Sequence, residues 1–210
     1  SLAQDDAHSG APMNTLDSTE SPMAMVSQQA APTMALVVQN ALLFQIGWFA
    51  CVLTASNNLA WLGSLTAAAL LLIHLWRAFG FKSEIIMIVL VTAVGTLWDS
   101  TLMQTRFYQF SHGILIAGIA PYWLIALWAV FATTLNLSLR WLKHRKILAA
   151  ALGFIAGPAS YYAGHRLGAI EFSNTAMALT LTAIGWALIL PLILMISERF
   201  DGYRTDEVNL

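Results

Sequence analysis

Charge is scarce in this 210-residue chain, which carries 10 Lys and Arg and 11 Asp and Glu, or 10% charged residues, against 58% hydrophobic residues. Soluble domains contain about 25% charged residues. The chain therefore has too few charges to cover a surface that faces water, and lipid is the expected solvent for most of it. The net charge of −1 gives no basis for nucleic-acid binding.

Cysteine and familiar catalytic motifs are also scarce. The single cysteine, Cys51, lies in an apolar run, which excludes an intrachain disulfide framework or a cysteine metal cluster and is typical of a small buried hydrophobe. The sequence contains no H-E-x-x-H pair, no G-x-S-x-G elbow and no Walker loop. We therefore expect no metal site and no cofactor.

Lysine and arginine are absent from residues 1–35, which are rich in Ser, Ala, Gln and Pro. We interpret this segment as a disordered tail, because it has no sustained apolar period. Without a positively charged start it does not resemble a secretory signal peptide. The residues before Met13 are a candidate artificial extension, so Met13, Met23 and Met25 are all candidate native starts.

Six apolar runs follow, each near the length of about 17–25 residues that a membrane-spanning helix needs. They cover 36–54, 58–76, 85–103, 119–139, 147–163 and 174–196. None alternates as barrel strands do, and lipid offers no partner to an unpaired backbone group, so helices are expected. The predicted fold is all-α: a bundle of six transmembrane helices over 36–197, followed by a short charged cytoplasmic tail at 198–210.

The positive charges predict the orientation of this bundle. With the N-terminus in the cytoplasm, the cytoplasmic segments would hold eight of the ten Lys and Arg residues, and the opposite side would hold only Arg106 and Arg166. Cytoplasmic loops are enriched in Lys and Arg. The sequence therefore predicts that both ends of the chain are cytoplasmic.

Asp99 is the one charged side chain inside the run 85–103. A carboxylate in hydrocarbon is costly, and it is usually paired, turned into the bundle or exposed to a water-filled cavity. It lies about one turn from the outer end of its predicted helix. Two interpretations stay open: an ion pair with Arg106 or Arg166 that locks two helices, or a site that binds a ligand or handles protons.

Further candidate binding residues lie in the outer halves of the helices or on polar stripes. A polar stripe on the fourth helix could either line a cavity or make interhelical hydrogen bonds, and the same alternative holds in the first helix. The full set of candidates is Asp99, Ser100, Arg106, His112, Thr133, Asn136, Tyr161, Tyr162, His165, Arg166, Gln45 and Trp48.

Two other segments carry open predictions. Gly153 and Gly157 are spaced so that another helix could approach closely, either within the chain or from a partner. The loop 106–120 is aromatic and then apolar before Pro121. It could extend the fourth helix past a kink, lie in the outer interface, or dip back into the bilayer.

Three stretches resemble a known family: LLFQIGWFACVL at 42–53, WLIALWAVFATTLNLSLRWL at 123–142 and GPASYYAGHRLGAI at 157–170. They are similar to an uncharacterised bacterial inner-membrane family, a domain of unknown function, and the resemblance extends over about 36–197. It implies a multi-pass protein of the bacterial inner membrane. It supplies no catalytic residues.

The leading functional hypothesis is a protein that binds, and in one version transports, a small or lipid-like molecule. Its pocket would open towards the outer leaflet, with Asp99 as the polar anchor and Arg166 or Arg106 balancing the charge. Membrane lipid is the other expected partner.

Two alternatives come from other classes. The chain could be an integral membrane enzyme of lipid modification that uses Asp99 with His112 or His165 for acid–base chemistry. It could also be a structural or assembly subunit, which would contact its partner through Gly153 and Gly157.

Overall fold

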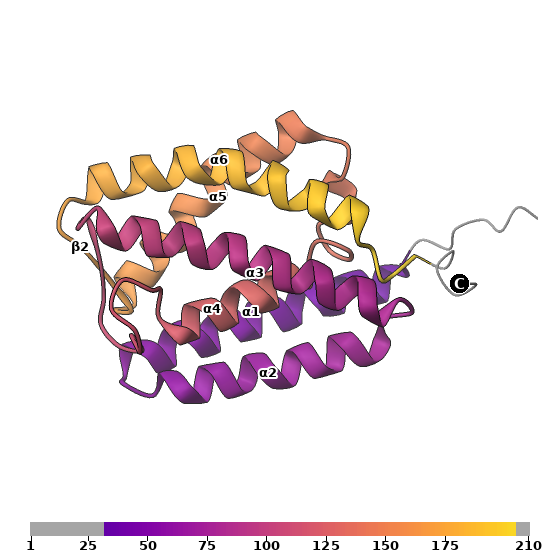
Figure 1. The fold of residues 1–210 in the computed structure, drawn as a ribbon, viewed down its shortest axis with the longest axis horizontal. Helices are drawn as coiled ribbons and strands as arrows, with labels where there is room; N and C mark the ends of the chain where they lie inside the picture. The colour runs from indigo at the N-terminus through magenta and orange to yellow at the C-terminus, as the bar shows by residue number, and fades with distance from the viewer. Residues whose placement is uncertain (1–31, 205–210) are drawn as a thin grey trace, which may run out of the picture.

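The structure is a computed structural model that describes residues 32–204. Five of its helices are long and apolar enough to span a membrane. This confirms the all-α prediction, and the helix ends fall within a few residues of the predicted runs. The five helices are α1 (Met34–Ser56), α2 (Ala60–Arg77), α3 (Phe81–Gln104), α5 (Lys146–Arg166) and α6 (Thr175–Arg199). Figure 1 shows α1, α2, α3 and α6 running roughly along the long axis of the molecule, with α5 crossing obliquely behind α6.

Two helices begin at residues that cap them. The Thr33 hydroxyl accepts a hydrogen bond from the Leu36 amide at 3.3 Å, and α1 starts at the next residue. The Asn174 side chain accepts from the Met177 amide at 3.0 Å, directly before α6. Such caps satisfy amides that have no partner inside the helix. Helix α1 therefore begins inside the predicted tail, while residues 1–31 of that tail lie outside the described part of the chain.

The fourth predicted helix is interrupted, so the expectation of one continuous helix over 119–139 is wrong. Helix α4 covers only Tyr122–Ala132. The Thr133 and Thr134 hydroxyls bond back to the carbonyls of Val130 and Phe131, both at 2.7 Å. Such local bonds compete with a regular helix. The backbone continues in tight turns to the short 3-10 helix η2 (Arg140–Leu142).

The interrupted segment lies in the interior of the bundle. Helix α4 packs against α1, α2 and α3, and residues 132–137 are all buried. Helix α5 packs mainly on α6, and α6 packs on α3. Non-helical backbone at membrane depth is tolerated where protein encloses it. The packing therefore explains how the turns after α4 can lie between longer helices.

Glycines allow the closest contacts between helices. A Cβ at Gly95 would lie 1.9 Å from the Trp128 ring, so that ring packs directly on the backbone of α3. The Trp186 ring of α6 packs in the same way on Gly157, where a Cβ would lie 2.3 Å from it. At Gly153 a Cβ would lie 2.3 Å from the Trp186 backbone carbonyl oxygen, so the two helix backbones themselves come close there. The predicted glycine face of the fifth helix is thus covered by α6 of the same chain. Of the two predicted alternatives, close approach of a helix within the chain is the one observed.

The loop 106–120 contains a short strand, β1 (Tyr108–Phe110), that pairs antiparallel with β2 (Ile170–Phe172). Gln109 is opposite Glu171 in this ladder. The loop is therefore not an extension of α4, and Pro121 lies at the N-cap of α4 rather than at a kink. We call the end of the bundle that carries β1 and β2 the ladder end.

At the opposite end the chain folds back after α6. Asp201, Gly202 and Tyr203 are buried against the bundle, so this part of the predicted tail at 198–210 is packed rather than free. We call this end the tail end. Residues 205–210 lie outside the described part of the chain.

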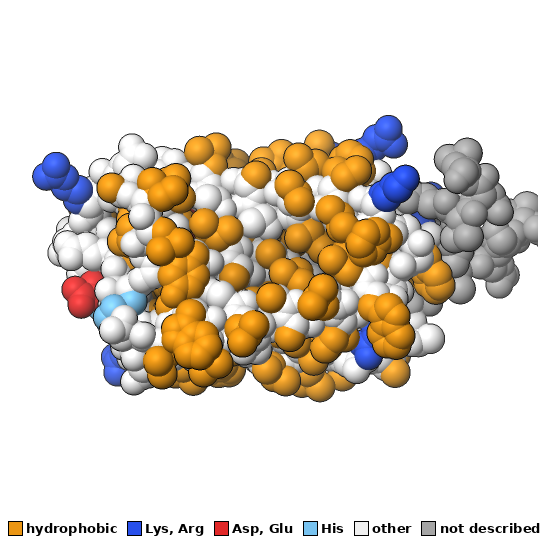
Figure 2. Space-filling view, turned by 60° about the horizontal axis from the view of Figure 1, so that its bottom comes forward, with side chains coloured by type: hydrophobic (Ala, Val, Ile, Leu, Met, Phe, Trp, Pro, Cys, Tyr) orange, Lys and Arg blue, Asp and Glu red, His pale blue; other side chains and the backbone are white. Residues whose placement is uncertain are grey.

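The surface agrees with a lipid environment. Figure 2 shows hydrophobic side chains spread over the middle of one face, with Lys and Arg near the two ends of the molecule. Large apolar residues are exposed on all five long helices, including Leu42, Leu72, Leu97, Ile155 and Leu188. Monomeric soluble proteins rarely expose apolar patches of more than a few hundred Å². The apolar band matches the low charge content of the sequence.

Candidate functional site

A cavity of about 850 Å³ lies between α1, α4, α5 and α6. Pockets for small molecules typically measure about 300–1,000 Å³ and are mostly apolar. This cavity is lined mainly by aliphatic and aromatic side chains. The aromatic ones include Phe44 and Trp48 of α1, Trp128 and Phe131 of α4, and Trp186 of α6.

Three of these aromatic rings form one packed wall. Trp128 and Trp186 stack with centroids 5.1 Å apart and planes 17° apart. Phe131 meets both rings edge to face, at 5.8 and 5.4 Å. Aromatic contacts of this kind add about 0.5–1.5 kcal/mol beyond area burial. The wall is therefore held in shape by its own packing.

The cavity separates α1 from α5, two helices with little backbone contact. One hydrogen bond joins them: Trp48 Nε1 donates to Ser160 Oγ at 3.0 Å. Both residues line the cavity. The gap between the helices is therefore bridged by side chains rather than closed by backbone packing.

Asp99 lies directly behind the cavity wall. Its side chain is fully buried and accepts hydrogen bonds from Trp128 Nε1 and from the Tyr161 hydroxyl. Both donors line the cavity, whereas Asp99 itself does not. The carboxylate therefore ties α3 to α4 and α5 through two side chains that a ligand would touch.

The predicted ion pair of Asp99 is wrong. Within residues 32–204, the ion pairs include neither Arg106 nor Arg166, and both oxygens of Asp99 are bonded to neutral donors. These partners were not predicted, because Trp128 and Tyr161 lie in apolar runs and carry no charge. Only their polar tips, an indole N–H and a phenol, make them partners for a buried acid.

The structure brings four predicted residues together around the cavity. Gln45 and Trp48 line it from α1, and Tyr161 and Arg166 line it from α5. Thr134 lines it in place of the predicted Thr133.

Other predicted residues stabilise the ladder end instead. Ser100 Oγ donates to the Thr96 carbonyl at 2.6 Å and accepts from the Ala120 amide at 3.0 Å. His112 Nδ1 bonds the Ala55 carbonyl, and His165 Nδ1 bonds the Ile170 carbonyl, both at 3.0 Å. Neither histidine bonds to Asp99. The structure therefore does not assemble the predicted acid–base pair.

Two predicted residues of the ladder end lie away from the cavity lining. Arg106 adopts a positive φ of 62°, and its carbonyl accepts from the Ser173 hydroxyl at 2.7 Å. Tyr162 is 41% exposed, with its ring 6.2 Å from that of His165. Neither residue is placed to contact a molecule in the cavity.

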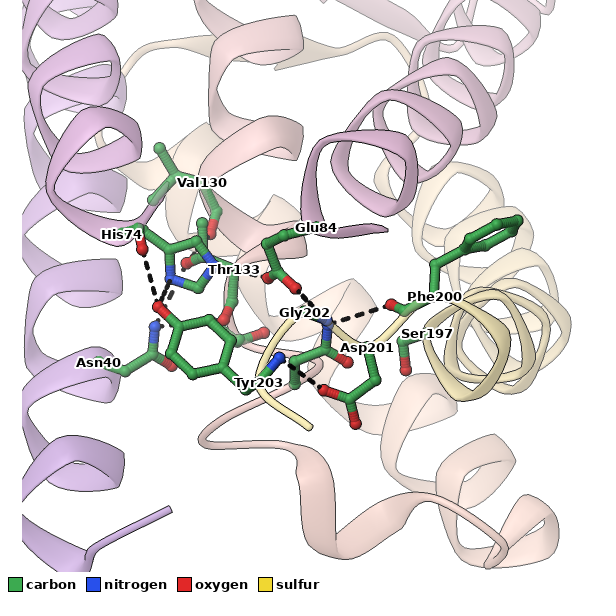
Figure 3. A network of polar contacts seen from close by, with 12 residues as sticks. Asn40, His74, Glu84, Val130, Thr133, Ser197, Phe200, Asp201, Gly202 and Tyr203 are labelled. Atoms are coloured by element: carbon green, nitrogen blue, oxygen red, sulfur yellow. Dashed lines mark hydrogen bonds and ion pairs between the residues drawn. The ribbon is translucent and has the colours of Figure 1, made fainter. Parts of the chain in front are cut away.

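A second polar cluster, which sequence reasoning missed, lies at the tail end (Figure 3). Glu84 is fully buried near the start of α3. Its Oε1 accepts from His74 Nε2 at 2.6 Å. Its Oε2 accepts from Asn136 Nδ2 at 2.7 Å and from the Gly202 amide at 3.0 Å. Four separate chain segments thus meet at one carboxylate.

Lys143 extends this cluster towards Asp201. Its ammonium donates to Asn136 Oδ1 at 2.6 Å, to the Ser197 carbonyl at 3.0 Å and to Asp201 Oδ2 at 2.9 Å. Arg140 pairs with the same carboxylate at 3.1 Å. Burial lowers the pKa of Lys143, and the hydrogen bond and charge of Asp201 oppose that shift. Two carboxylates, Glu84 and Asp201, are thus balanced by two cations.

Tyr203 closes the cluster from the C-terminal side. Its hydroxyl donates to the His74 carbonyl at 2.8 Å, and its amide donates to Asp201 Oδ1 at 3.1 Å. Burial raises the pKa of Tyr203, and the nearby charge of Glu84 raises it further, so the phenol stays a donor. A void of only about 20 Å³ remains beside His74, Asn40 and Tyr203. That volume suits one water molecule and no larger ligand.

The predicted pocket residues Thr133 and Asn136 belong to this tail-end cluster. Asn40 Nδ2 donates to the Thr133 carbonyl and hydroxyl, both at 3.3 Å. The interhelical hydrogen-bond alternative is therefore the one observed for both residues. A signal was present in the sequence, because Glu84, Lys143 and Asp201 all follow or precede runs that end on the same predicted side. Of the three, only Lys143 entered the sequence interpretation, as one of the positive charges that predict the orientation.

The tail-end cluster and the surroundings of Asp99 differ in the empty volume beside them. The tail-end cluster is filled and charge-balanced, so it has no room for a substrate. Within the described residues no group of three His, Cys, Asp or Glu side chains is placed to hold a metal ion. The cavity in front of Asp99 is the candidate site.

Comparison with known proteins gives a family and nothing beyond it. No curated protein and no solved structure matches the chain. The sequence model of DUF2878, described as a protein of unknown function, matches residues 37–192. This confirms the resemblance noted in the sequence, and the chain belongs to the DUF2878 family.

Proposed function

We propose that this protein binds a lipid-like molecule inside the membrane, in the cavity between α1 and α5. The observation that carries the proposal is the cavity itself, about 850 Å³ in volume and lined mainly by apolar and aromatic side chains. An apolar cavity of this size favours the burial of hydrocarbon. It lies among helices whose outer surfaces are themselves suited to lipid.

The proposed topology has six crossings with both chain ends in the cytoplasm. The fourth crossing consists of α4 together with the turns and η2 up to Leu142. Trp128 of this segment bonds Asp99 near one end of α3, and Asn136 bonds Glu84 near the other. The excess of Lys and Arg at the tail end supports its assignment to the cytoplasm. The bacterial inner membrane is the location that the family resemblance implies.

Access from the lipid phase is part of the proposal. Helices α1 and α5 flank the cavity and are joined by the bond from Trp48 to Ser160. Breaking one hydrogen bond costs about 0.5–1.5 kcal/mol. An acyl chain can therefore enter sideways between the two helices without unfolding either.

The role of Asp99 in this function is to position the wall. It fixes Trp128 and Tyr161, whose rings face the cavity, and does not itself touch the bound molecule. This replaces the expectation that Asp99 is a direct polar anchor.

A cavity-filling substitution tests the proposal. Ala156 lines the cavity on α5, and Ala159, one turn further along, is exposed and outside the lining. Native mass spectrometry in mild detergent would count the lipid-like molecules that remain bound to each variant. We expect Ala156→Trp to remove them and Ala159→Trp to keep them. Equal retention by both variants, with both folded, would overturn the proposal.

A further inference from the structure

We propose that the bound molecule is an anionic amphiphile, with an apolar chain in the cavity and a phosphate or carboxylate head held by Arg166 at the ladder end. This inference rests on the proposed function and names its ligand class. It concerns the part of the cavity beside Arg166, away from the packed aromatic wall.

The charge of the lining supports an anion. Of the described residues that line the cavity, Arg166 is the one with a charged side chain, and no Asp or Glu is among them. Arg166 takes part in none of the ion pairs within residues 32–204. The acid behind the cavity wall, Asp99, has both oxygens bonded to Trp128 and Tyr161. The guanidinium is thus not neutralised by an acid of the site.

Small side chains on one face of α5 connect the cavity with the Arg166 guanidinium. The lining residues of α5 before Arg166 are small: Ala156, Ser160, Ala163 and Gly164 follow one face, with only Leu152 and Tyr161 larger. Side chains three and four positions apart lie on one helix face. Small residues there leave a track for a chain that ends beside Arg166. Guanidinium groups bind phosphate and carboxylate with two parallel hydrogen bonds.

A free anion fits the site less well than an amphiphile. The rest of the lining is apolar, so inorganic phosphate would have one cation and little else to bind. A chain adds about 0.8 kcal/mol for each methylene group that is buried. A cationic amphiphile would fill the same cavity but would meet Arg166 with a like charge.

A simpler alternative role for Arg166 is to stabilise the C-terminus of α5. Arg166 lies in the last turn of α5, where a cation interacts favourably with the helix dipole. That role would change stability equally with every ligand. A preference for one head group, lost on substitution, separates the two roles.

The experiment uses the full chain in nanodiscs of zwitterionic lipid. Bromododecyl phosphate, bromododecanoate and bromododecyl trimethylammonium are titrated. The exposed Trp61, Trp76 and Trp141 are replaced by Phe in every variant, so that quenching of the remaining tryptophans by bromine reports binding in the cavity. The protein with these three changes alone should bind the two anionic probes about tenfold more tightly than the cationic one. Arg166→Gln should abolish this preference. Arg106→Gln, at the same end but outside the lining, should keep it.

The outcomes separate this inference from the proposed function. If the three probes bind equally, or if Arg166→Gln keeps the preference, the inference is overturned. If Ala156→Trp then still removes quenching by all three, the proposed function stands. If Ala156→Trp leaves all quenching unchanged, both fail. Displacement of the probes by inorganic phosphate at similar concentrations would assign the site to a free anion and overturn the amphiphile.

Discussion

Helix α3 carries two fully buried carboxylates, and the two differ in the kind of partner that satisfies them. Glu84 at the tail end is bonded to an imidazole, an amide side chain and a backbone amide, within a cluster whose charges balance. Asp99 near the ladder end has two neutral aromatic donors. The first acid joins chain segments to one another. The second holds the wall of a cavity.

The difference shows how a buried acid can be used without an ion pair. Removing one partner of a buried charge network leaves the others desolvated and unpaired, which is the costly case. Trp128 and Tyr161 are neutral donors, so removing Asp99 leaves two polar groups without an acceptor but no unpaired charge in the interior. We therefore expect Glu84 to matter most for stability and Asp99 most for binding.

The largest effect is expected at Glu84. Glu84→Ala leaves His74, Asn136 and the Gly202 amide without their shared acceptor and should lower the free energy of unfolding by about 3–5 kcal/mol. Thermal unfolding in detergent measures this. Lys82→Ala, exposed on the same turn of α3, is the control and should change little. A loss at Glu84 no greater than at Lys82 would remove the distinction between the two acids.

A smaller, pH-dependent effect is expected at Asp201. Asp201→Asn removes the charge that opposes the lowering of the Lys143 pKa by burial, so that pKa should fall further in the folded state. A Lys with a lowered folded pKa destabilises the protein below that pKa, and the penalty disappears as pH rises to its unfolded value.

The Asp201→Asn variant should therefore lose about 1–3 kcal/mol at neutral pH and recover part of it as pH is raised towards 10. Unfolding curves of variant and wild type across this range measure the change. Glu198→Gln, at a partly exposed acid on α6, should show no such recovery. A deficit that grows with pH would contradict the assigned role of Lys143.

Asp99 should show the reverse balance of stability and binding. Asp99→Ala removes the acceptor of Trp128 and Tyr161, and we expect a stability loss of about 1–2 kcal/mol, less than at Glu84. Retention of the lipid-like molecule should fall about tenfold, because the wall is no longer fixed. Asp99→Asn keeps one acceptor oxygen and should lie between. If Asp99→Ala destabilised the protein as much as Glu84→Ala and left binding unchanged, the two acids would share one structural role.

The sequence predicted the parts of this fold that depend on apolar length. The five long helices follow their hydrophobic runs, because lipid requires every backbone group to be paired within a helix. It failed at α4, where Thr133 and Thr134 turn their hydroxyls back to the chain. An apolar run carries no sign of such an interruption when the turns are enclosed by protein.

The site was harder to predict than the helices. Asp99 was identified as important from its cost in hydrocarbon alone, and it is indeed buried and bonded. Its partners were not found, because a search for compensating charge overlooks Trp and Tyr as donors. The Glu84 cluster was missed because its members come from the ends of runs, and no sequence spacing connects residue 84 with residue 202.

The smallest effect is expected at the bond between α1 and α5. Trp48→Phe keeps an aromatic ring in the lining but removes the donor to Ser160, at a cost in stability of about 1 kcal/mol or less. Exchange of a brominated amphiphile, followed by stopped-flow fluorescence, should become faster with little change in affinity, since the bond closes the opening without shaping the wall. Trp61→Phe, exposed on α2 and outside the lining, should leave the exchange rate unchanged. Equal rates in the Trp48→Phe variant and the wild type would place ligand access elsewhere than between α1 and α5, while the division of roles between Asp99 and Glu84 would stand.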